Sequence, residues 1–234
     1  MPNNISYVVE GKGDVILFLH GWGQSKESMI PLIENLKNNY KCVLLDMPGF
    51  GNSCFNNTKN IKEYTQYIRK FLIENNIIPK YIVGHSFGGK VAVEYYLEYK
   101  DVEKLFIIAS PILKPKRNLN YYYKIIKYKL KKHLKIKSNE GSYDYKNCKE
   151  SMKSFFVSVV NTHYDKLIKN IEIPTILIWG KNDEKVPIKK AYKLDNKLKN
   201  SELYIINGDH FAYIENIEFT KLVIQKHLRR NNNG

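Results

Sequence analysis

Short, mainly apolar runs recur along the chain, and longer stretches with helical spacing separate them. Such runs are typical of strands buried on both faces of a sheet; they cover residues 15–19, 41–46, 80–84, 104–109, 175–179 and 202–206. The separating stretches repeat apolar residues every three or four positions, as in a helix with one buried face; they cover residues 25–38, 60–76, 87–99, 188–199 and 217–229. Strands that alternate with helices predict an α/β fold, a mostly parallel sheet flanked by helices.

The alternation stops at Ser110-Pro111 and resumes near residue 171. Residues 111–170 are basic, rich in tyrosine and poor in strand signals, with amphipathic helical spacing over 122–134 and a further helical stretch over 150–169. We therefore predict one core made of residues 1–110 and 171–234, with a short helical insertion at about 111–170.

Composition fits a single globular domain that works in a reducing compartment. The chain has 234 residues, 43% of them hydrophobic, and no apolar run near the ~20 residues that span a bilayer. The first residues lack the pattern of a secretory signal, and the three cysteines lack the spacing of a metal site. We therefore expect a cytoplasmic protein with free thiols and without a bound metal.

Positive charge is concentrated in the insertion. The formal net charge is +15, and residues 111–137 carry ten Lys or Arg and no Asp or Glu. A local cluster of this kind predicts an anionic partner or surface more strongly than overall basicity does.

A candidate nucleophile follows the third apolar run. Residues 84–88 read Gly-His-Ser-Phe-Gly, between a predicted strand and a predicted helix. A serine on such a sharp turn projects its hydroxyl away from the backbone, and the flanking Gly84 and Gly88 allow the close approach that the turn needs. Ser86 is therefore the candidate nucleophile.

A serine hydroxyl needs a base to accept its proton, and the base needs a partner that fixes its tautomer. Of six histidines, only His210 lies in a glycine-containing loop at the end of a predicted strand, where ligands bind in parallel sheets. The other five histidines lack this placement: His20, His85, His133, His163 and His227. Asp183 follows another strand end and is the candidate acid. Its alternatives are Glu184 and Asp209.

The negative oxygen of a tetrahedral intermediate needs N–H donors. His20-Gly21-Trp22-Gly23 follows the first buried strand and offers the backbone N–H of Trp22, although read alone it is an ordinary tight turn. The second candidate is the N–H of Phe87, directly after Ser86 at a predicted helix N-terminus, where the helix dipole favours negative charge.

Taken together, these segments resemble the α/β-hydrolase family over nearly the whole chain. A further match is Asp46-Met47-Pro48-Gly49-Phe50-Gly51-Asn52-Ser53, which resembles a mainly structural loop of the family but has Asn52 at an often basic position. The order Ser86, Asp183, His210 is the family order. The resemblance implies that residues 111–170 are a cap over the active site and that the chain is a cofactor-free carboxylesterase acting on esters or thioesters.

The His-Gly-Trp-Gly turn and the small size also resemble the carboxylesterases that release a pimeloyl methyl ester from acyl carrier protein. Acyl carrier proteins are acidic, so this resemblance implies a contact with basic side chains of the cap: Lys124, Lys127, Lys131 and Lys132.

Other functions stay open at this stage. The same triad in similar proteins supports carbon–carbon bond hydrolysis, lyase or perhydrolase chemistry, and some hydrolase-like proteins only bind ligands. Tyrosines among lysines near residues 121–132 can suit single-stranded nucleic acid or an anionic membrane; we favour instead a cap helix with solvated lysines and expect neither partner. No metal or dinucleotide motif is present, and substrate-binding residues are not assigned.

Overall fold

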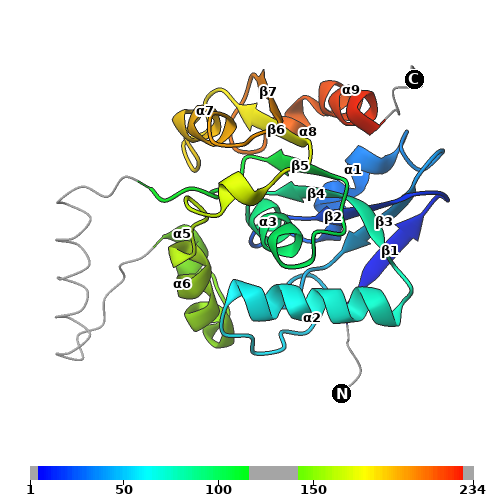
Figure 1. Cartoon of the computed structure of the whole chain (residues 1–234). Coiled ribbons are helices and arrows are strands. Elements are labelled where there is room, and N and C mark those ends of the chain that lie inside the picture. The colour runs from blue at the N-terminus through cyan, green and yellow to red at the C-terminus, as the bar shows by residue number, and fades with distance from the viewer. Residues whose placement is uncertain (1–4, 116–141, 229–234) are drawn as a thin grey trace.

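Seven strands form one sheet in the part of the chain that the computed structural model describes, residues 5–115 and 142–228 (Figure 1). They are β1 (Tyr7–Glu10), β2 (Val15–Leu19), β3 (Lys41–Leu45), β4 (Pro79–His85), β5 (Lys104–Ile108), β6 (Thr175–Gly180) and β7 (Ser201–Ile206). Their order across the sheet is β1-β3-β2-β4-β5-β6-β7; β1 runs antiparallel to β3 and every other pair is parallel. The predicted mostly parallel sheet is confirmed, and each predicted strand end is correct to within one residue.

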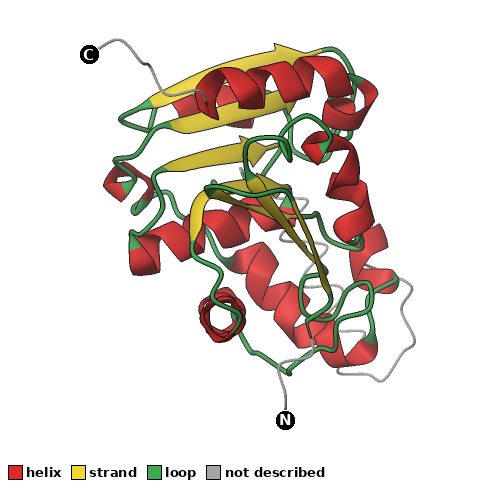
Figure 2. Cartoon of the chain, turned by 90° about the vertical axis from the view of Figure 1, so that its right-hand side faces the viewer, coloured by secondary structure: helices red, strands yellow, loops and turns green. Residues whose placement is uncertain are grey.

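Helices cover both faces of the sheet (Figures 1 and 2). They are η1 (Lys26–Met29), α1 (Ile30–Ile33), α2 (Ile61–Glu74), α3 (Phe87–Tyr99), α5 (Tyr143–Lys146), η2 (Glu150–Met152), α6 (Lys153–Asn161), η3 (Ile168–Asn170), α7 (Lys189–Asp195), α8 (Ala212–Glu215) and α9 (Ile217–Leu228). α2 and α3 pack together on the side that carries α6, whereas α1 packs with α9 on the other side. The central strands β2, β4, β5 and β6 are buried almost throughout, which explains their continuous apolar sequences.

Three predicted helices are shorter than expected, and one of them is the helix over 188–199, where α7 ends at Asp195. In the helix predicted over 25–38, α1 ends at Ile33, and the N–H groups of Leu36 and Lys37 both turn back to the Ile33 carbonyl. A Cβ at Gly11 would lie 2.3 Å from the Lys37 carbonyl oxygen, so the following turn is held against another loop instead of continuing as a helix. In the helix predicted over 150–169, α6 ends at Asn161 because Thr162 takes an extended conformation.

The described part of the predicted cap, residues 111–115 and 142–170, contains helices and no strand. Its longest helix, α6, places Phe155 within 4.7 Å of the Tyr64 ring on α2, centre to centre. The predicted helix over 122–134 and the basic side chains named for it lie outside the described residues: Lys124, Lys127, Lys131 and Lys132.

Within the described ranges, none of the helices has the length and apolar content that a membrane span requires.

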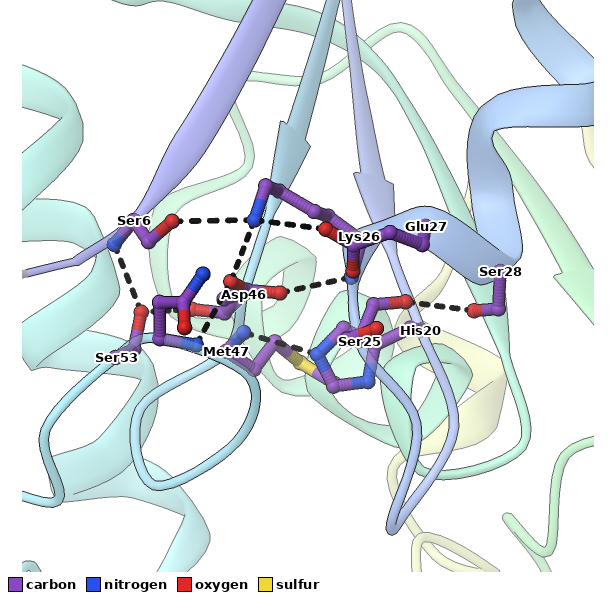
Figure 3. Close-up of polar contacts among 10 residues, drawn as sticks. Ser6, His20, Ser25, Lys26, Glu27, Ser28, Asp46, Met47 and Ser53 are labelled. Carbon is purple, nitrogen blue, oxygen red and sulfur yellow. Dashed lines mark hydrogen bonds and ion pairs between the residues drawn. The ribbon is translucent and has the colours of Figure 1, made fainter.

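The loop after β3 is held by a buried ion pair (Figure 3). The Lys26 ammonium lies 2.7 Å from Asp46 Oδ2, and the Lys26 N–H donates to Oδ1 at 2.9 Å. The Asn52 N–H also donates to this carboxylate, at 3.0 Å. The positive charge beside Asp46 therefore comes from the first residue of η1, at the end of the loop after β2, while Asn52 contributes a backbone N–H.

His20 joins the same two loops as a buried neutral imidazole (Figure 3). Its Nδ1–H donates to the Gly21 carbonyl at 2.7 Å, and its Nε2 accepts the Met47 N–H at 3.0 Å. Burial lowers the pKa of His20 to about 4. Protonation would turn the Nε2 acceptor into a donor facing another donor, so the arrangement requires the neutral ring.

We expect acid to destabilise the fold well before its carboxylates are protonated. The unfolded chain takes up a proton on His20 near pH 6.5, whereas the folded chain does so near pH 4, so stability falls with pH in that window. His20 alone should remove roughly 2 kcal/mol from the free energy of unfolding between pH 7.5 and 5. Urea unfolding at the two pH values measures the loss, and His20→Asn should show a smaller one. An equal loss in both proteins would contradict this assignment.

Candidate active site

Ser86 occupies the sharp turn between β4 and α3. Its backbone has φ 50° and ψ −110°, a conformation that non-glycine residues rarely adopt, and its N–H donates to the Ile108 carbonyl at 2.8 Å. A Cβ at Gly84 would lie 2.5 Å from the Gly88 carbonyl oxygen, and one at Gly88 would lie 2.1 Å from the Leu19 carbonyl oxygen. The glycines are therefore needed for the backbone contacts that force the turn and expose the serine.

The structure brings the three predicted catalytic side chains into one hydrogen-bonded chain. His210 Nε2 lies 3.0 Å from Ser86 Oγ, and His210 Nδ1 lies 2.8 Å from Asp183 Oδ2. An ionised carboxylate only accepts, so Nδ1 carries the proton and Nε2 is free to accept from the serine hydroxyl. The other Asp183 oxygen accepts the Val186 N–H at 2.8 Å, which fixes the carboxylate.

The residues that the sequence offered as alternatives for the acid and the base lie elsewhere. Glu184 is exposed, and Asp209 Oδ1 accepts the Phe211 N–H at 2.6 Å within its own loop. His227 lies 2.9 Å from the Tyr204 hydroxyl on the β7 side of the molecule. His163 lines a cavity beside Ser86, while His133 falls outside the described residues.

His85 is a site residue that the sequence did not reveal. Its Nε2 lies 3.1 Å from the backbone carbonyl oxygen of His210 and its Nδ1 lies 2.9 Å from Gln24 Oε1, so the neutral ring, which has one N–H, donates to one of these two oxygens. Burial lowers its pKa to about 3, which keeps the imidazole uncharged. His85 therefore connects the loop that carries His210 to the turn that carries Ser86. Its position directly before Ser86 is the one signal that could have drawn attention to it.

Trp22 and Phe87, the candidate donors to an oxyanion, flank the serine. Gly21 and Gln24 close a turn through a backbone hydrogen bond of 3.2 Å, in which the Trp22 N–H takes no part. Phe87 is the first residue of α3, so its N–H has no acceptor within the helix. The rings of Trp22 and Phe87 meet edge to face at 5.3 Å, and both residues line the cavity that contains Ser86.

Two cavities of different character meet at Ser86. One has a volume of about 280 Å³ and is mainly apolar; its walls include Trp22, Phe156, Val159, Val160 and Leu194. The other has a volume of about 160 Å³ and is more polar; its walls include Gln24, His85, Asp144, Lys185 and His210. These wall residues come from segments far apart in the sequence, which is why motif reading could not assign them.

Over residues 5–115 and 142–228, no group of three or more His, Cys, Asp or Glu side chains is arranged to hold a metal ion.

Comparison with known proteins identifies the fold family. The alpha/beta hydrolase fold family model matches residues 14–128 and 122–217. A 2-hydroxy-6-oxo-6-(2'-aminophenyl)hexa-2,4-dienoic acid hydrolase of Metapseudomonas resinovorans is 27% identical, over 91% of this chain and 83% of its own. A pimeloyl-[acyl-carrier protein] methyl ester esterase of Vibrio vulnificus is 24% identical, over 91% and 92%.

Among solved structures, an esterase from Exiguobacterium antarcticum superposes with a TM-score of 0.77 at 16% identity, covering 95% of this chain and 94% of that one. At this identity the likeness establishes the fold, and the family model extends over most of both halves of the sheet. The resemblance seen in the sequence is confirmed: the chain belongs to the alpha/beta hydrolase fold family.

Proposed function

We propose that this protein is a serine hydrolase that cleaves carboxylic esters or thioesters through an acyl-enzyme on Ser86. The observation that carries the proposal is the continuous chain Asp183–His210–Ser86, with contacts of 2.8 and 3.0 Å, at the junction of two cavities. The predicted enzyme class, a hydrolase of the carboxylesterase type, agrees with the family and with the esterase among its structural neighbours.

The roles follow from the hydrogen-bond directions. Ser86 Oγ attacks the ester carbonyl carbon while its proton passes to His210 Nε2. Asp183 holds the Nδ1–H side of the ring and stabilises the imidazolium that forms. The N–H groups of Trp22 and Phe87 donate to the oxyanion, His210 returns the proton to the leaving alcohol or thiol, and a water then repeats the sequence on the acyl-enzyme.

The two cavities suit the two halves of an ester. We assign the acyl chain to the larger apolar cavity, and the alcohol or thiol to the smaller polar one next to His210. This assignment gives Ser86 access to the carbonyl carbon between them. The acyl cavity is bounded by the described part of residues 111–170, which supports the interpretation of that segment as a cap over a core of 1–110 and 171–234.

The named substrate of the Vibrio vulnificus relative suggests an acyl-carrier-protein ester as one natural substrate. An acidic carrier would meet the basic residues of the cap, for which we propose Lys124, Lys127, Lys131 and Lys132. All three cysteines are free, which suits a reducing compartment, and we place the enzyme in the cytoplasm.

Carbon–carbon bond hydrolysis is the second candidate reaction, because the Metapseudomonas resinovorans relative is named for a hexadienoic acid substrate. The same serine, base and acid would serve both reactions. Lys185 in the polar cavity offers a positive charge to a substrate carboxylate.

A serine-directed fluorophosphonate should label this protein at Ser86 alone. After proteolysis, the label should be found on the one peptide that contains residues 81–90. Labelling is measured by mass spectrometry, with Ser86→Ala as the blank and Ser110→Ala as a matched variant of a second cavity serine that should still label. A panel of alkyl esters, an acyl-carrier-protein methyl ester and a hexadienoic acid then separates the candidate reactions. Failure to label would favour a non-catalytic ligand-binding role.

A further inference from the structure

Lys90 is a buried cation next to the nucleophile that the proposed mechanism does not use. It lies on α3 one turn after Ser86, with its N–H 3.3 Å from the Ser86 carbonyl oxygen. The residue is 2% exposed, and burial lowers the pKa of its ammonium to about 8. Within the described ranges its hydrogen-bond partners are carbonyl oxygens, and burial without a nearby opposite charge accounts for the lowered pKa, so another group must compensate its charge.

The compensation comes from the C-terminal end of α6. Lys90 Nζ donates to the carbonyl oxygens of Val159 and Thr162, at 2.8 Å each. Val159 lies in the last turn of α6, and Thr162 is its C-cap. The last carbonyls of a helix lack donor partners within it and carry the negative end of its dipole, so a cation there is favourable. Two elements far apart in the sequence are thus joined by one side chain.

The same helix forms a wall of the acyl cavity. Val159, Val160 and Phe156 line the cavity together with Ser86 and Lys90. Toward its N-terminal end, α6 is held by aromatic packing: Phe156 meets the Trp22 ring at 4.8 Å, and Phe155 stacks on Tyr64. At its other end, α6 is held to α3 by the Lys90 hydrogen bonds and, two residues after Thr162, by the buried Tyr164, whose hydroxyl donates to Glu94 at 2.7 Å.

We propose that Lys90 is a positioning residue that fixes the C-terminal end of α6 against α3 and thereby sets the width of the acyl cavity. The inference rests on the proposed function for the meaning of that cavity. Lys90 acts through α6 on substrates long enough to reach Val159 and Val160, and it takes no part in the chemistry at Ser86.

Lys90→Met keeps the length of the side chain and removes the hydrogen bonds. For an octanoyl ester, we expect KM to rise about tenfold with kcat nearly unchanged, because two buried hydrogen bonds that hold the cavity wall are lost. For an acetyl ester, both constants should stay within about twofold. Lys90→Gln, which keeps two N–H donors without the charge, should recover most of the loss. Lys153→Met, at an ion pair on the same helix, is the matched control.

A second measurement does not depend on activity. Trp22 packs against Phe155 and Phe156 of α6, whereas Trp179 is buried and donates to the Val186 carbonyl. When the C-terminal end of α6 is released, Phe156, one turn before Val160, should move away from the Trp22 ring. Lys90→Met should therefore show more acrylamide quenching of Trp22 and no change at Trp179. If Lys90→Met fails to fold, partial effects of Lys90→Gln on KM and quenching provide the same test.

The outcomes separate the two proposals. A wild-type protein that hydrolyses no ester, combined with increased quenching in Lys90→Met, would reject the proposed function and keep the link between Lys90 and α6. Active wild type with unchanged octanoyl KM would overturn the role of Lys90. Equal losses for acetyl and octanoyl esters would also overturn it, since they would indicate damage to the nucleophile turn. An increase in KM confined to acyl chains with a terminal carboxylate would also overturn the positioning role, because it would show that the Lys90 ammonium contacts the substrate directly.

Discussion

Ser86→Ala is expected to lower kcat for ester hydrolysis by about 10⁶-fold, since loss of the nucleophile disables the unit it forms with His210 and Asp183. The residual rate would come from the oxyanion donors and from binding, and should stay ~10³–10⁴-fold above hydrolysis in water. The fold should remain, because alanine meets the same constraint as serine at φ 50°. kcat at saturating butyryl ester and a thermal unfolding curve measure the two effects.

A second cavity serine provides the control for this experiment. Ser110 Oγ donates to the Ser86 carbonyl oxygen at 2.6 Å, so Ser110→Ala removes a hydroxyl from the same wall without removing the nucleophile. We expect less than about a tenfold loss of kcat from it. A Ser86→Ala protein that keeps a tenth of the wild-type kcat in a clean preparation would be incompatible with an acyl-enzyme on this residue.

Asp183→Asn is expected to lower kcat by about 10⁴-fold with little change in the position of His210. The amide that replaces the carboxylate would keep an acceptor for the Val186 N–H but could present its own N–H groups to His210 Nδ1. The imidazole would then carry its proton on Nε2, facing Ser86, and could no longer accept the serine proton. The rate constant for acylation, measured as the burst with a p-nitrophenyl ester, reports this step.

The two neighbouring carboxylates test the assignment of the acid. Glu184→Gln changes an exposed side chain, and Asp209→Asn changes one that accepts a hydrogen bond within its own loop. Neither should reduce the burst rate by more than about fivefold. A loss from either that equals the loss from Asp183→Asn would move the acid to that residue.

The strands and the proximity of the three candidate triad residues were predictable for the same physical reason. Buried parallel strands have apolar sequences that stand out, and their carboxyl ends meet at one edge of the sheet. Residues placed just after those ends, such as Asp183 and His210, are therefore brought together with Ser86 by the topology. The strand missed, β1, is a short antiparallel edge strand whose half-exposed residues give no apolar run.

The contacts that position the candidate triad could not be predicted from the sequence. His85 reaches the His210 carbonyl across 125 residues, and Lys90 reaches the end of α6 across 69 and 72 residues. Both side chains contact backbone carbonyl oxygens, which every residue has, so the residue type of the partner gives no signal in the sequence. The length of the helix predicted over 25–38 was overestimated for a related reason, because the loop at Gly11 packs against the backbone at Lys37, where the structure has a turn.

The loop after β3 influences the rate of the proposed reaction, although it supplies no reacting group. His20 and Lys26 attach both ends of the Trp22 turn to that loop, through Met47 and Asp46. In the proposed mechanism, the Trp22 N–H is consequently preorganised before substrate arrives, and little energy is spent in reorienting its dipole as negative charge develops on the carbonyl oxygen. Substitutions at Asp46 should thus raise the activation free energy of ester hydrolysis as well as lower the melting temperature.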